Sequence, residues 1–189
     1  MLRMWSRGRS LDPKQLNRLI TDSETADSLF SLAQQHGQSF DFIHARAVNM
    51  LWAIAKMGLR NKLFVSLLLM EAEPKLPSFN AQNMANTAWA LATLGRKDTT
   101  FTGALLVAAK SKLPSFNAQD LATTAWALAT LDYYDGVFMG ELLGAVKPKV
   151  PSFILADETQ MSIALTKFNT KDAEFERALE ARRAQLGGK

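Results

Sequence analysis

Apolar positions recur along this chain at two spacings, a short one of three to four residues and a long one of 37 residues. The short spacing is typical of an amphipathic helix, and no stretch alternates apolar and polar residues as a half-buried strand would. The long spacing holds four series of large side chains in one register. They are Trp52, Trp89 and Trp126; Phe42, Phe79, Phe116 and Phe153; Phe64, Phe101, Phe138 and Phe175; and Leu68, Leu105, Leu142 and Leu179. A fixed period of this length indicates a repeat architecture.

The first half of each repeat predicts a helix that begins at an asparagine. Asn80 and Asn117 are favourable N-cap residues, and a run of alanine, leucine and tryptophan follows each of them. Glycine commonly ends a helix in the left-handed conformation, so we expect these helices to stop at Gly58 and Gly95. Asp132 takes the same place in the third unit.

The second half of each repeat predicts another helix, which we expect to run from Phe64 to Leu76 and over the corresponding residues of later units. Proline cannot continue the helical hydrogen-bond ladder, so Pro77, Pro114 and Pro151 are expected to end these helices. A pair of such short helices cannot bury its apolar faces alone, and stacking of successive pairs buries them. The pattern therefore predicts an all-α fold, a right-handed helix-pair solenoid (an α-α superhelix) with a 37-residue repeat.

This period divides the chain into a tail, a partial repeat, four full repeats and a second tail. The expected boundaries are 1–10 for a basic N-terminal tail, 11–41 for a partial repeat that caps the stack, 42–78, 79–115, 116–152 and 153–186 for the four helix-pair repeats, and 187–189 for the C-terminal tail. The last repeat is expected to be a polar cap. Glu180 and Arg183 stand in it where Leu69 and Ala72 stand in the first repeat, and a charged outer face has no neighbour to pack against.

The composition narrows the classes of function. The chain has 189 residues and no cysteine, which excludes disulfides, thiolate metal sites and thiol nucleophiles. No window approaches the roughly 18 consecutive apolar residues that a membrane span needs. The net charge of +4 permits a polyanionic partner without requiring one. Arg3, Arg7 and Arg9 lie in an N-terminal segment without acids, which fits either a remnant of an organelle transit peptide or the mature end of a longer precursor.

Residues suited to catalysis do not form a recognisable set. His36 and His44 lack the partner pattern of a zinc site or of a nucleophile. Asp157 and Glu158 fall in the first turn of a predicted helix, where acids favour the helix dipole. We therefore expect no enzymatic activity, no cofactor, no metal and no small-molecule substrate.

The repeat resembles a known family in its residues as well as its length. The segment from Ala85 to Gly95 reads Ala-Asn-Thr-Ala-Trp-Ala-Leu-Ala-Thr-Leu-Gly and follows a Phe-Asn pair, as in octotricopeptide repeats. The segment from Leu29 to Lys56 resembles the same family in algal and protist proteins. The resemblance covers roughly Asp22 to Phe168. It implies a helix-pair solenoid in a chloroplast or mitochondrion that binds organellar transcripts, although four repeats are few for this family.

Polar positions that differ between nearly identical repeats are the candidate contacts to RNA bases. The first column of such positions is Arg46, Asn83, Asp120 and Asp157. The second column, three residues further along each first helix, is Asn49, Asn86, Thr123 and Gln160. Helical-repeat readers of RNA use two or three side chains for each base. The alternative for the first column is N-capping, and the alternative for the second is a solvated helix face.

Alanine occurs beside both columns in every repeat and is expected to leave room for a ligand. The positions are Ala53, Ala90, Ala127 and Ala164. The tryptophans recur on the apolar side of the first helix, so we expect them in the core and not in contact with bases.

Lysines are the candidate phosphate contacts. They are Lys75, Lys112 and Lys149 near the ends of the second helices, and Lys56 and Lys167 near the ends of two first helices. Each neutralised phosphate would release counterions. For the three lysines of the second helices, the alternative is a favourable interaction with the helix C-terminus.

Two functions remain after these exclusions. The first is binding of single-stranded organellar RNA by occlusion or positioning. The second is a structural subunit that packs, through protein-protein contacts, on a large organellar complex such as a ribosome or a photosynthetic assembly. An RNA reader predicts that the second column and the lysine column border one groove. A scaffold predicts instead that apolar residues lie against another chain.

Overall fold

The computed structural model describes residues 43–56, 58 and 62–187. Over these residues all regular structure is helical, with eight α-helices, three short 3₁₀ segments and no strand. The predicted all-α fold class is therefore confirmed. The tail predicted at residues 1–10, the partial repeat predicted at 11–41, and His36 lie outside the described residues.

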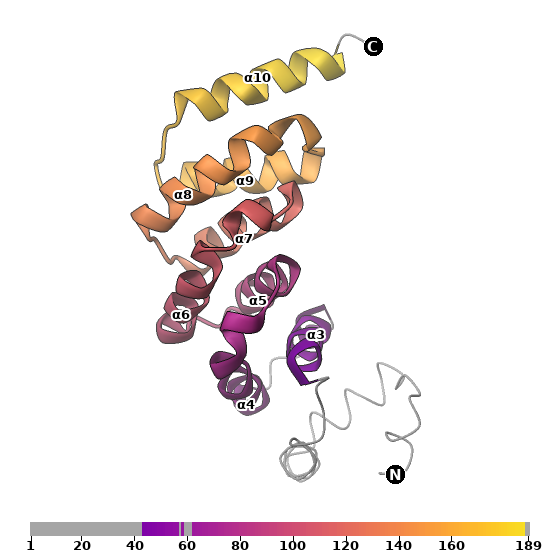
Figure 1. The fold of residues 1–189 in the computed structure, drawn as a ribbon, viewed down its shortest axis with the longest axis vertical. Coiled ribbons are helices and arrows are strands. Elements are labelled where there is room, and N and C mark those ends of the chain that lie inside the picture. The colour runs from indigo at the N-terminus through magenta and orange to yellow at the C-terminus, as the bar shows by residue number, and fades with distance from the viewer. Residues whose placement is uncertain (1–42, 57, 59–61, 188–189) are drawn as a thin grey trace.

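The helices form two rows that run along the molecule (Figure 1). The first row contains α3 (Ile43–Lys56), α5 (Ala81–Leu94), α7 (Ala118–Leu131) and α9 (Leu155–Lys167). The second row contains α4 (Lys62–Ala72), α6 (Thr99–Lys110), α8 (Gly136–Val146) and α10 (Ala173–Gly187). In the first row each helix packs on the next, α3 on α5, α5 on α7 and α7 on α9. The second-row helices begin at intervals of 37 residues, and so do α5, α7 and α9.

The asparagine caps and left-handed ends of the first-row helices are confirmed. The side-chain oxygen of Asn80 accepts a hydrogen bond from the Asn83 N–H at 2.8 Å, and Asn117 begins α7 in the same way. Gly95 ends α5 with a φ of 64°, and Asp132 ends α7 with a φ of 61°. Aspartate is one of the few residues other than glycine that adopt this conformation readily, which explains the replacement.

Three of the four second-row helices, α6, α8 and α10, begin after aspartates that the sequence analysis did not identify as caps. Their carboxylates accept hydrogen bonds from the N–H of the phenylalanine three residues later. The pairs are Asp98 with Phe101 at 3.1 Å, Asp135 with Phe138 at 2.9 Å, and Asp172 with Phe175 at 2.9 Å. The signal was present in the sequence, because these aspartates also recur every 37 residues.

The prediction that the second helices extend to the prolines is wrong. α4 ends at Ala72, and Pro77 lies inside the 3₁₀ segment η3 (Glu73–Ser78). Pro74, near the start of η3, is the physical reason, since it cannot donate the backbone hydrogen bond that the next helical turn needs. The corresponding segments are η4 (Leu113–Ser115) and η5 (Lys147–Ser152). α10 runs to Gly187, one residue into the predicted tail.

One hydrophobic core runs between the two rows. Phenylalanines that precede the first-row helices, among them Phe79 and Phe116, are almost completely buried within it. Alanines such as Ala88 and Ala125 lie between neighbouring first-row helices, where small side chains let the backbones approach closely. The core therefore leaves little space for large side chains within the first row itself.

Candidate nucleic-acid interface

Each first-row helix leaves one stripe of side chains exposed or half-buried, and together these stripes form what we call the first-helix face. Its members are Trp52 and Lys56 on α3; Asn86, Trp89 and Thr93 on α5; Thr123, Trp126 and Thr130 on α7; and Gln160, Ile163 and Lys167 on α9. Within each helix they are three, four or seven residues apart and therefore lie on one side. The face consequently combines a central row of large apolar side chains with a polar row on either side.

The tryptophans are not the fully buried core residues that the sequence predicted. Trp52 is 39% exposed and Ile163 is 46% exposed, whereas Trp89 and Trp126 are half-buried and pack against the core with one side. The prediction of core packing is thus correct for the side of Trp89 and Trp126 that faces the core, and it is wrong for Trp52. The close approach of the helices explains this, because an indole ring does not fit between backbones that alanines bring together.

Two of the indole rings and one lysine form a cluster at the N-terminal end of this face. The ring centroids of Trp52 and Trp89 are 6.3 Å apart, and their planes are tilted by 43°. The Lys56 Nζ lies 5.0 Å from the centroid of the Trp52 ring. This is a cation–π distance, so the π-face of Trp52 is accessible to a cation at the surface.

The second column lies on the first-helix face. Asn86, Thr123 and Gln160 are all half-buried there. The Thr123 hydroxyl and the Gln160 Oε1 are 3.2 Å apart, a hydrogen bond that joins α7 to α9. Equivalent positions of adjacent helices are therefore close enough for one extended ligand to contact both. Asn49 lies on α3, but its side chain is outside the described residues.

Two members of the first column, Asp120 and Asp157, cap their own helices and do not lie on this face. Asp120 and Asp157 are buried, and their carboxylates accept hydrogen bonds from the backbone N–H of Asn117 at 3.3 Å and of Ile154 at 3.0 Å. Burial raises the pKa of Asp120, while the hydrogen bond from Asn117 and the charge of Lys149 act in the opposite direction. These are the contacts expected of the capping interpretation.

The other two residues of the first column give less information. Asn83 is half-buried at the third position of α5. Arg46 lies on α3, and its side chain is outside the described residues.

Three of the four alanines expected to leave room for a ligand do not line this face, and the side chain of Ala53 is outside the described residues. Ala90, Ala127 and Ala164 have no exposed surface, since each packs inside the core. The expectation is wrong because it placed the open stripe one residue too far along each helix. The open positions are those of the tryptophans.

Two lysines of the second helices bind the backbone of the preceding repeat. The Lys112 Nζ donates to the carbonyl oxygens of Pro77 and Phe79, the latter at 2.7 Å. The Lys149 Nζ donates to the corresponding carbonyls of Pro114, at 2.9 Å, and Phe116. We call these contacts the lysine staples. They occupy both ammonium groups, and neither sequence interpretation anticipated them.

The remaining members of the lysine column have other partners. Leu186 stands at the lysine position of the last repeat, and it is Arg182 on α10 whose Nη2 lies 3.4 Å from the carbonyl oxygen of Phe153. Lys75, in η3, pairs instead with Glu71 at the end of the preceding α4, at 3.3 Å.

Lys167 differs from Lys56 although both lie at the ends of first-row helices. The Lys167 Nζ is 3.0 Å from the Asp132 carboxylate, which also lies 3.7 Å from the Lys97 Nζ. Lys167, and to a lesser extent Lys97, lowers the pKa of Asp132. Lys56 forms no ion pair with any described residue. It is therefore the lysine of this face most available to a phosphate.

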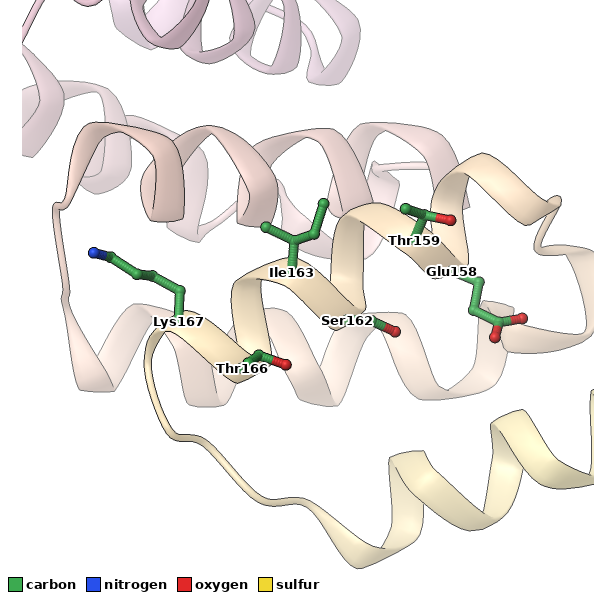
Figure 2. A pocket seen from close by; sticks show the side chains of 6 residues that line it. All are labelled: Glu158, Thr159, Ser162, Ile163, Thr166 and Lys167. Carbon is green, nitrogen blue, oxygen red and sulfur yellow. The ribbon is translucent and has the colours of Figure 1, made fainter.

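A shallow depression marks the C-terminal end of the first row (Figure 2). It is lined by residues of α9 alone, namely Glu158, Thr159, Ser162, Ile163, Thr166 and Lys167. Glu158 and Ser162 occupy positions at which α7 buries Leu121 and Ala125 completely. Arg183 donates to Glu158 at 2.7 Å from the second row. The surface on which another first-row helix would pack is therefore polar at this end.

Two other kinds of feature are absent from the residues that the structure describes. No group of three or more His, Cys, Asp or Glu side chains in this part of the chain could hold a metal ion. None of its helices is both long enough and apolar enough to cross a membrane.

Comparison with known proteins adds no assignment to this geometry. No family model matches the sequence, and no curated protein matches it.

Proposed function

We propose that this chain is a non-catalytic binding protein that holds an extended single-stranded RNA along the first-helix face. The observation that carries the proposal is a row of partly exposed tryptophans flanked by neutral polar side chains. Aromatic rings stack on any base, and amide and hydroxyl groups form hydrogen bonds with base edges. A single face of the molecule thus offers both kinds of contact that single-stranded RNA uses.

The proposal includes the repeat architecture. We propose that the two rows form a right-handed helix-pair solenoid with a 37-residue repeat, of the octotricopeptide type that the sequence resembles. The regular helix starts support it, as do hydrogen bonds between residues 33, 35 and 37 positions apart. In such an array one ligand strand contacts equivalent positions of successive repeats.

The charge distribution favours binding of a nucleic acid with modest affinity. The chain carries a net charge of +4, and no acidic residue belongs to the first-helix face. The lysine staples remove two of the five candidate phosphate contacts, and the ion pair with Asp132 weakens a third. We therefore expect few phosphate contacts and a shallow dependence on salt.

The direct test is fluorescence anisotropy with a labelled pool of single-stranded RNA at two salt concentrations. We expect saturable binding whose logarithmic dependence on salt has a slope of about −1 to −2, which corresponds to about two phosphates. Asn86→Ala is expected to weaken binding several-fold. Asn83→Ala, one turn earlier on α5, is the matched control and is expected to leave it unchanged. Absence of binding at low salt would remove the proposal.

A second candidate function, that of a structural subunit, is favoured by a separate observation. The lysine column does not border the first-helix face as an RNA reader predicted, and the second row exposes apolar side chains such as Met70, Val107 and Val137. Both features favour a structural subunit that packs on a large organellar complex. Co-sedimentation with a large particle that survives nuclease treatment would support this function over RNA binding.

Location in a chloroplast or mitochondrion belongs to the same proposal. It is supported by the family resemblance and by the arginines of residues 1–10, which lie outside the described residues. Immunodetection in purified organelles tests it. Recovery in the cytosolic fraction alone would contradict it.

A further inference from the structure

The two ends of the first-helix face differ. They carry different aromatic, charged and amide groups that a ligand could contact. We propose that the step from α3 to α5 is a nucleotide-anchoring site. One unpaired base packs against the indole rings of Trp52 and Trp89, and Lys56 contacts the adjoining phosphate. This inference rests on the proposed function and adds to it where along the face, and through which side chains, the strand is held.

The aromatic pair supplies the surface for the base. The rings of Trp52 and Trp89 are neighbours at 6.3 Å, but their tilt of 43° means that they are not stacked face to face. Lys56 lies over the more exposed ring, Trp52, and a base would take that place on the ring while Lys56 moves to the phosphate. Indole is a large ring, and stacking on it accepts any of the four bases.

The adjacent lysine supplies the contact for the phosphate. Lys56 follows Trp52 by one turn of α3, and its ammonium group lies 5.0 Å from the ring centroid. A nucleotide presents a planar base and an anionic phosphate on opposite sides of one sugar. The pairing of an exposed ring with an exposed ammonium group matches that arrangement. A phosphate would also form a stronger, charge-assisted hydrogen bond with the lysine than the ring provides.

The polar neighbour supplies a contact for the base edge. Asn86 precedes Trp89 by three residues on α5 and is half-buried on the same face. Its carboxamide offers both a donor and an acceptor, the combination needed to form two hydrogen bonds with a base edge. The anchoring site therefore combines stacking, charge and base-edge recognition within two adjacent helices.

The opposite end of the face lacks each of these three features. Ile163 stands where the other helices carry tryptophan and has no π-face. Thr123 and Gln160 form a hydrogen bond with each other, and Lys167 is paired with Asp132. The same columns continue to α9, but there the Gln160 Oε1 and the Lys167 ammonium group already have partners within the protein. The strand is consequently held most firmly at α3 and α5.

Charge decides between a nucleotide and the other ligand that aromatic surfaces accept, a cationic side chain of a peptide. Lys56 already occupies the position over the Trp52 ring, and the whole chain carries a net charge of +4. A second cation would be repelled at this place, whereas a phosphate is attracted.

The experiment uses the full chain and fluorescein-labelled single-stranded oligoadenylate, with anisotropy and tryptophan quenching as separate readouts. Trp52→Leu is expected to weaken binding at least about fivefold, because stacking on one base is lost. Trp52→Phe keeps an aromatic face and is expected to recover most of the affinity. Lys56→Gln is expected to make the salt slope shallower by about 0.7, as for one phosphate of a single strand. Lys167→Gln is the matched control and is expected to leave the slope unchanged.

The outcomes separate this inference from the function on which it rests. If the wild-type chain binds RNA and Trp52→Leu binds equally well, the anchoring site is wrong and RNA binding remains. Equal changes of slope in Lys56→Gln and Lys167→Gln would overturn the phosphate contact in the same way. If the wild-type chain binds no RNA at all, the proposed function itself fails. Capture of a peptide at Trp52 would replace the nucleotide by the other class of ligand.

Discussion

At the residue scale, the same type of side chain has different roles that depend on its neighbours in space. Lys112 and Lys110 are two residues apart. Lys112 donates to two backbone carbonyl oxygens of the preceding repeat, whereas Lys110 forms an exposed ion pair with Glu141 at 2.8 Å. Pro77 lies near the end of a 3₁₀ segment and Phe79 lies just before a helix, so neither carbonyl oxygen has a backbone N–H partner within a helix. An ammonium group at that position therefore satisfies acceptors that would otherwise depend on water.

We predict that Lys112→Met lowers the free energy of unfolding by about 1–3 kcal/mol, because it removes a charged hydrogen-bond donor and leaves two carbonyl oxygens without it. Lys110→Met is the matched control, and loss of its exposed ion pair is expected to cost less than about 1 kcal/mol. Urea denaturation followed by circular dichroism measures both. Equal stability of the two variants would show that the lysine staple contributes no more than a surface charge.

At the element scale, the sequence predicted the ends of the first-row helices well, but it predicted the ends of the second-row helices and the environment of the side chains poorly. The caps at Asn80 and Asn117 and the left-handed Gly95 depend on backbone groups a few residues away, so local sequence determines them. The exposure of Trp52 depends on how closely α3 and α5 approach, and the contact of Lys112 depends on a loop 33 residues earlier. The spacing of apolar residues determines neither how closely these helices approach nor which loop Lys112 contacts. The candidate site could therefore be predicted only as far as its second column and Lys56, and the exposed tryptophans were missed.

One helix start departs from the pattern and gives a prediction at this scale. α9 begins after Ile154, whose backbone angles of −95° and 168° resemble those of Asn117 at −80° and 176°. Isoleucine cannot accept the capping hydrogen bond, and Ile154 is 62% exposed. We predict that Ile154→Asn raises the free energy of unfolding by about 0.5–1.5 kcal/mol. Thermal unfolding compares it with Ile154→Ala, which removes the apolar surface without supplying a cap. A variant Ile154→Asn no more stable than Ile154→Ala would contradict the capping argument.

At the scale of the whole molecule, the two rows divide two tasks between them. The first row presents the tryptophans and the second column, and the second row contributes the staples that hold successive repeats in register. α9 presents polar residues at its outer side, and Glu180 and Arg183 of α10 are exposed. The RNA strand that we propose would contact four first-row helices in the described part of the chain, which corresponds to a few nucleotides and to modest selectivity.

The central claim is that RNA lies along the first-helix face, and photo-crosslinking locates it most directly. The full chain is irradiated with single-stranded RNA that carries 5-iodouridine, which reacts with nearby aromatic rings, and the modified peptides are identified by mass spectrometry. We predict crosslinks at Trp52, Trp89 and Trp126, with the highest yield at Trp52. Crosslinks confined to residues outside this face, such as the exposed Tyr134 in the loop between α7 and α8, would contradict RNA binding along the first-helix face.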